Sequence, residues 1–194
     1  TSAMNAYGVE NLSASQATDV LVGAVREGKA EASDLAASMG QVLPIASELQ
    51  VGFDQVGAAI AAMTRTGTNA QTAATQLKAI LNSVLKPSSQ AADALGTMGT
   101  SAKELRQQLR EEGLVSVLGF LREQMNENEE AMSLVFPNIR ALSGALDIMG
   151  ANAAENVAIF DRMKDTTGLN EEAFEAAQGP AFKLRQQLQR LKAE

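Results

Sequence analysis

Few residues in this sequence have the types and spacing that chemistry requires. The 194 residues include no histidine and no cysteine, which removes the imidazole and thiolate groups that most often act as bases, nucleophiles or metal ligands. The remaining candidates are carboxylates, chiefly Glu10 and Asp19, with Arg26 seven residues after Asp19. A glycosidase-like site needs two carboxylates across a cleft, one with a raised pKa, and isolated acids on helix faces meet neither condition. We therefore expect no enzymatic activity.

The same reasoning assigns no catalytic, cofactor-binding or metal-binding residue anywhere in the chain. Point changes at Asp19, Glu48, Arg65 or Glu155 are expected to abolish no activity. Arg65 lies in the segment Thr64–Gly67, which is a candidate partner-binding turn, although helix capping is the simpler interpretation. Tyr7-Gly8 is interpreted in the same way, as a helix end over which the tyrosine packs.

Composition indicates a helical interaction protein whose apolar groups are small. Hydrophobic residues make up 45% of the chain, aromatic residues only 4%, and 34 residues are alanine. At roughly 25 cal/mol per Å² of buried apolar area, an alanine seam stabilises less than a leucine seam. Packing must therefore be extensive or shared between subunits, and we expect self-association.

Charge and hydropathy exclude several classes of partner. The net charge of −7 argues against a phosphate backbone, so nucleic acid is not expected as a partner. No apolar run reaches 18 residues, so no membrane span is expected. The lack of cysteine suits folding in a reducing cytoplasm. The chain opens on Thr1 within a helical pattern and closes within another, so we expect a fragment of a longer protein.

The pattern of turn residues predicts an all-α fold. No segment alternates with the period of a strand, so strands are not expected. The predicted fold is a compact array of short, alanine-rich helices with a C-terminal helical arm. Ile60, Leu77, Leu81, Leu118 and Leu142 are predicted to lie in the core. The turns are predicted at the following glycine and proline residues: Gly28, Gly40, Gly52, Gly67, Pro87, Gly99, Gly150 and Gly168.

Several helix ends are predicted individually. Ser13 and Gln16 form a capping-box pattern, and Ser88 is placed to cap a short helix after Pro87. Asp54 is predicted to be the N-cap of the helix that contains Ile60. The longest clean helix is expected over Asn69–Leu85, where apolar residues recur at three-and-four spacing.

Three regions are distinguished by composition. Residues 1–99 carry 13 charged side chains and form an alanine-rich helical core, whereas residues 100–194 carry 26. Residues 100–172 are a more charged helical continuation with a leucine stripe interrupted at Gly113, and residues 173–194 are a C-terminal helix that starts a coiled-coil-like arm. Gly179-Pro180 should kink or restart that arm.

The arm carries a candidate oligomer interface. Its apolar residues alternate steps of three and four, which is the spacing of a coiled-coil seam. They are Phe174, Ala177, Ala181, Leu184, Leu188 and Leu191. Burial of this seam against the same domain and association about a threefold or higher axis are both open at this point.

The order of the turn motifs resembles the helical core domain of phage tail tape measure proteins. The matching segments cover nearly the whole chain, with the largest departure over Gly99–Gly113. They are Ala6-Tyr7-Gly8-Val9, Ala17-Thr18-Asp19-Val20-Leu21, Glu27-Gly28-Lys29, Asp34-Leu35-Ala36, Met39-Gly40, Ile60–Gly67, Ala74-Thr75-Gln76-Leu77, Lys86-Pro87-Ser88, Leu134–Leu142 and Gly168–Phe174.

The resemblance implies a structural protein of the virion tail that is made in the bacterial host cytoplasm. It implies roles in tail assembly and tail-length determination, a location in the tube lumen or at the tail tip, and tail tube, tail-tip or baseplate proteins and assembly chaperones as partners. Because the helices are short, we expect an anchoring or initiation domain rather than an extended ruler. The alternatives are a generic bacterial helical adaptor module and a membrane-active pore former, for which Asp54–Met63 is too short to span a bilayer.

Overall fold

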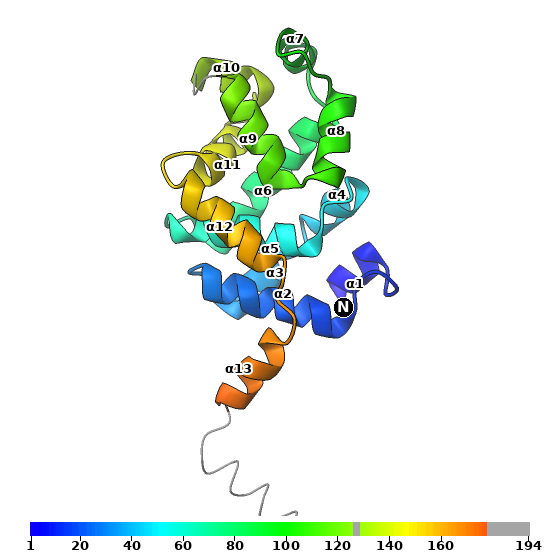
Figure 1. Cartoon of the computed structure of the whole chain (residues 1–194), viewed down its shortest axis with the longest axis vertical. Helices are drawn as coiled ribbons and strands as arrows, with labels where there is room; N and C mark the ends of the chain where they lie inside the picture. Colours follow the sequence, from blue (N-terminus) through cyan, green and yellow to red (C-terminus); the bar gives the residue numbers. More distant parts are fainter. Residues whose placement is uncertain (126–128, 178–194) are drawn as a thin grey trace, which may run out of the picture.

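The described residues of the computed structural model, 1–125 and 129–177, form thirteen helices and no strand. The bounds are α1 Ser2–Tyr7, α2 Ala14–Glu27, α3 Ala32–Met39, α4 Leu43–Glu48, α5 Phe53–Arg65, α6 Ala70–Leu85, α7 Ser89–Thr97, α8 Ala102–Glu111, α9 Leu114–Gln124, α10 Glu129–Val135, α11 Ile139–Met149, α12 Ala153–Met163 and α13 Leu169–Ala177 (Figure 1). The all-α prediction is confirmed. Each predicted glycine or proline turn lies between two helices.

Side-chain caps start several of these helices as the sequence predicts. Ser13 Oγ accepts from the Gln16 backbone amide at 3.2 Å, and Gln16 Oε1 accepts from the Ser13 amide at 2.9 Å. Ser88 caps α7 through the Ala91 amide. The prediction for Asp54 is wrong. Gly52 is the N-cap of α5, and Asp54 lies in the first turn of that helix, where a carboxylate complements the helix dipole.

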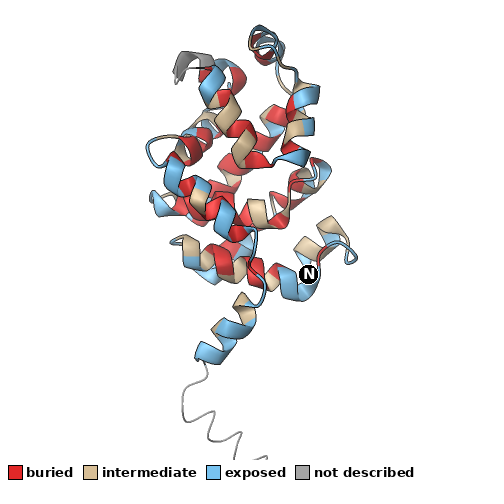
Figure 2. Cartoon of the chain, in the orientation of Figure 1, coloured by how far each residue is buried: buried red, intermediate tan, exposed pale blue. Residues whose placement is uncertain are grey.

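Helix α5 is the centre of the molecule and is covered on all sides. Every residue from Val56 to Thr64 is buried, because α2, α6, α11 and α12 all pack against this helix (Figure 2). A Cβ added at Gly57 would lie 3.0 Å from both Val20 Cγ1 and Met163 Cε. The small residues of α5 therefore allow neighbouring helices to approach closely.

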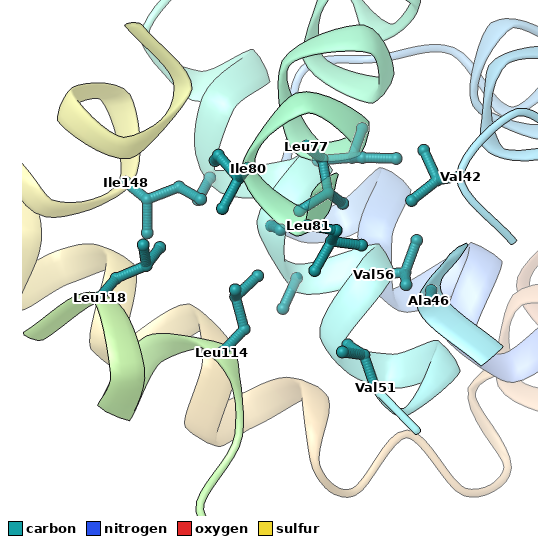
Figure 3. Packing of buried hydrophobic residues seen from close by; sticks show 14 of the residues in the cluster. Val42, Ala46, Val51, Val56, Leu77, Ile80, Leu81, Leu114, Leu118 and Ile148 are labelled. Carbon is teal, nitrogen blue, oxygen red and sulfur yellow. The ribbon is translucent and has the colours of Figure 1, made fainter. Parts of the chain in front are cut away.

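The core continues from α5 through α6 to α9 and α11. Leu77, Ile80 and Leu81 of α6 lie among side chains of α4, α5, α9 and α11 (Figure 3). Of the five predicted core residues, Ile60, Leu77, Leu81 and Leu118 are buried, and Leu142 is half-buried against the same cluster. The predicted stripe is buried at every position: Leu105, Leu109, Leu114, Leu118, Leu121 and Met125.

One hydrophobic cluster includes residues from Leu12 to Met163, and therefore from both sides of the compositional change near residue 100. The division into 1–99, 100–172 and 173–194 stays a prediction. Helix α13 projects from one end of the long axis of the molecule (Figure 1). The rest of the arm, 178–194, lies outside the described residues.

Candidate interaction surfaces

The acidic residues considered for catalysis have structural partners. Asp19 is buried, and its Oδ1 accepts a hydrogen bond from the backbone amide of Asn170 at 2.7 Å. Arg26 pairs with Glu172 at 3.0 Å instead of with Asp19, and Glu10 is exposed. These contacts fix the start of α13 on α2.

Asp19 and Asp54 line one cavity of about 290 Å³ together with Tyr7. Burial raises the pKa of the Asp54 carboxyl, with a smaller opposing contribution from backbone amides at the start of α5. Burial, followed by the charge of Asp54, raises the pKa of the Tyr7 hydroxyl, which donates to the Val51 carbonyl oxygen at 2.8 Å. Tyr7 also packs edge-on against Phe53 with ring centroids 6.1 Å apart. Tyr7 therefore holds α1 against the loop before α5.

The turn after α5 also makes internal contacts. The Thr64 hydroxyl accepts from the Lys29 backbone amide at 3.2 Å and donates to the Ala61 carbonyl oxygen at 3.0 Å. Arg65 forms an ion pair with Glu155 at 3.4 Å. These contacts connect α5 to the end of α2 and to α12, in agreement with the capping interpretation.

Helix α13 presents one free face to solvent. Glu171, Phe174 and Glu175 are three and four residues apart and therefore share that face, and the Phe174 side chain is 62% exposed. Glu172 points instead to Arg26 of α2. Ala177 is exposed as well, whereas Ala181, Leu184, Leu188 and Leu191 lie outside the described residues. The coiled-coil seam therefore stays a prediction.

A cationic groove lies along α6, bounded by α7 and by the connection between α10 and α11. Its main cavity has a volume of about 480 Å³ and is lined by Lys78 of α6, by Lys86, which directly follows that helix, and by Arg140 of α11. Among the residues that the structure describes, no acidic side chain lines this cavity. An adjoining cavity of about 320 Å³ shares Thr75 and Arg140 and reaches Ile139. Within the described residues, none of the three cations has an ion-pair partner.

The position of the groove explains why sequence reasoning missed it. Lys86 belongs to the segment Lys86-Pro87-Ser88, for which the sequence predicts a turn and a helix cap, and Arg140 belongs to Leu134–Leu142, which carries part of the family resemblance. Both residues are cationic in a chain with a net charge of −7, and this is the sequence signal that could have indicated a cationic groove. Only the packing of α11 on α6 brings the two segments together.

The floor of the adjoining cavity contains one buried polar group without a partner. Gln76 is 8% exposed, and its Oε1 atom has no hydrogen-bond partner. The residue lies where α6 meets Gly144 of α11, so close that a Cβ at Gly144 would be 2.9 Å from Gln76 Cβ.

Among the described residues, no helix combines the length and hydropathy that a bilayer crossing requires.

Comparison with known proteins places this fold in a family. A family model described as phage-related minor tail protein matches residues 1–136. The chain is 25% identical over 184 residues to the tape measure protein of Pneumococcus phage Dp-1, an alignment that covers 91% of this chain and 16% of that relative. No solved structure matches significantly. The chain therefore belongs to the phage-related minor tail protein family and is a structural protein of the virion tail.

Proposed function

We propose that this region is a folded anchoring domain of a tape measure protein, which attaches the length-determining part of that protein to the tail tip. The observation that carries the proposal is the compact packing of short helices, of which the longest, α6, has 16 residues. A compact domain of about 170 residues has a radius of gyration of about 15 Å. A continuous helix of the same number of residues is about 255 Å long.

This difference separates an anchor from a ruler. In a ruler, tail length changes in proportion to residue number, which requires an extended chain. In a folded domain, added residues bulge from the surface and leave the distance between its ends unchanged. The chain spans 16% of the tape measure protein of phage Dp-1, so the proposal leaves most of such a protein available to set length.

Insertion of a helical segment into an exposed turn of this domain tests the proposal in the phage. Gly99 is exposed, a Cβ added there would meet no atom within 4 Å, and the residue lies between α7 and α8, so fourteen helical residues placed after it should leave every helix intact. We expect tails of unchanged length in electron micrographs. Tails longer by about 21 Å would make this region part of the ruler.

Removal of a core helix provides the complementary experiment. Deletion of Asn69–Leu85 removes α6, against which α3, α5 and α11 pack, and is expected to abolish tail assembly. Viable tails shortened by about 25 Å would contradict the anchoring proposal. The insertion variant is the control, because it keeps the fold and changes only residue number.

The partners proposed for the anchor are tail-tip or baseplate proteins, the tail tube and assembly chaperones. The match to a phage tail family favours this function over a bacterial adaptor module. Self-association about a threefold or higher axis through the predicted 174–191 seam is part of the same proposal. Leu188→Glu would place a charge in that seam and should remove the association that the seam provides, which light scattering would show as a lower average mass.

A further inference from the structure

We propose that the cationic groove along α6 receives helix α13 of a second copy of this chain, so that copies associate head to tail. This contact goes beyond the anchoring function and does not depend on it. It also differs from the predicted coiled-coil seam, in which identical faces of the arm meet each other.

Charge complementarity supports this occupant. Lys78 on α6 and Lys86, directly after the end of that helix, both line the groove, and so does Arg140 of α11. The free face of α13 carries Glu171 and Glu175, four residues apart and both exposed. Within the described part of the chain, neither carboxylate has an ion-pair partner, and every charged side chain that lines the groove is a cation.

Size and exposed apolar groups fit the same occupant. Helix α13 has nine residues and is about 14 Å long, and the eleven residues from Thr75 to Leu85 along α6 cover about 17 Å. Phe174, between the two glutamates of α13, is 62% exposed, and Ile139 at the edge of the groove is 72% exposed. Docking covers both of these large apolar side chains.

The placement of the two surfaces requires a second copy. The groove runs along α6 to the start of α7 and the end of α10, and α7 and α10 lie at the end of the long axis opposite to α13 (Figure 1). A chain therefore does not fill its own groove. Because the two surfaces differ, the contact is heterologous, and repeated contacts close into a ring or extend into a filament.

Charge-reversal variants of the 194-residue chain test the contact by sedimentation equilibrium. The groove variant is Lys78→Glu with Arg140→Glu, and the α13 variant is Glu171→Lys with Glu175→Lys. Each is expected to weaken association at least about tenfold, because attraction between the surfaces becomes repulsion. The chain that carries all four changes is expected to associate again.

Matched controls reverse charges elsewhere. Lys103→Glu on α8 and Glu48→Lys on α4 alter exposed residues outside both surfaces and should leave association unchanged. Circular dichroism checks that each variant keeps the helical fold. Monomeric wild type at high concentration, or failure of the fourfold variant to regain association while folded, would overturn the proposal.

Cross-linking identifies the surfaces in contact. The chain has no cysteine, so Asn82→Cys in the groove and Ala177→Cys at the end of α13 introduce single thiols. A mixture of the two variants treated with a short bis-maleimide should link residue 82 of one copy to residue 177 of another. Links only between two copies of residue 177 would indicate a parallel coiled coil and overturn the groove contact.

Discussion

At the scale of single residues, the space around two helical glycines predicts opposite effects of an added methyl group on stability. Gly144 of α11 lies where an added Cβ would be 2.9 Å from Gln76 Cβ, whereas a Cβ at Gly119 of α9 would meet Met149 Cε at 3.6 Å. Gly144→Ala should destabilise the fold by about 1–3 kcal/mol, because α6 and α11 must separate. Gly119→Ala should stabilise it by about 0.5–1 kcal/mol through helix propensity. Urea unfolding measures both, and equal effects would contradict this account of the contact.

Asn156 provides a second prediction at this scale. Its buried Nδ2 donates to the carbonyl oxygens of Asp147 and Ile148 at 3.0 and 2.7 Å, and so satisfies the end of α11 from within α12. Asn156→Ala should lower the free energy of unfolding by about 1–3 kcal/mol, because both carbonyl groups lose a buried partner.

Asn156→Asp should lower the free energy of unfolding more at pH 7, since a carboxylate only accepts hydrogen bonds. This variant should recover stability as the pH falls and the carboxyl becomes a donor. Thermal unfolding at pH 7 and pH 4 separates the two variants. If the aspartate variant were as stable as the alanine variant at pH 7, the carboxylate would not be repelled by the carbonyl oxygens of Asp147 and Ile148, and the prediction would be wrong.

At the scale of elements, an ion pair links α2 to α12. Arg162 Nε and Nη2 donate to the two carboxylate oxygens of Glu27 at 2.8 and 2.7 Å, and these bonds hold the pKa of Glu27 below its ordinary value of 4.5. The unfolded chain therefore binds a proton at higher pH than the folded chain does. The stabilisation that this ion pair provides is complete above the pKa of Glu27 in the unfolded chain. It is lost as the pH falls through the lower pKa of Glu27 in the folded chain.

The variant Glu27→Gln should therefore unfold more easily than the wild type at pH 7, by about 0.5–1 kcal/mol for a partly exposed pair. The difference should disappear in acid below the pKa of Glu27. Arg162→Ala should lose at least as much stability at pH 7, because it also removes the ion pair of Arg162 with Glu155 at 3.3 Å. A stability difference between Glu27→Gln and wild type that stays constant from pH 7 to pH 3 would contradict the assignment of the effect to this carboxylate.

How far the sequence predicts these elements depends on the range of the interactions. The caps at Ser13 and Ser88 depend on local hydrogen bonds, and the turn at Gly67 depends on a positive φ of 104° that glycine adopts readily, and the structure confirms all three. The burial of α5 on all faces does not follow from its own sequence, because Gly57 and its alanine neighbours are compatible with an exposed helix face. The groove was not predicted because Lys78 and Arg140 meet only through tertiary packing.

At the scale of the whole molecule, the shared core predicts that residues 1–99 do not fold alone. Without the later helices, α6 loses its contact with α11 and α5 loses α12, which uncovers residues such as Ile80 and Ala62. The truncated chain should give a broad, non-cooperative thermal transition, whereas the whole chain should unfold cooperatively. A sharp transition for 1–99 would instead support an independent domain ending near residue 99.

The attachment of α1 and α13 determines how this molecule responds to mechanical tension. Helix α13 packs on α2 through the exposed Arg26–Glu172 pair and the Asn170–Asp19 hydrogen bond, and α1 is held to α4 by the Ser47–Ala6 hydrogen bond. A pull on Thr1 and Ala177 therefore loads these peripheral contacts before α5, which is enclosed by its neighbours. We therefore expect the ends to detach at lower force than the core, so that the domain extends in two stages under tension.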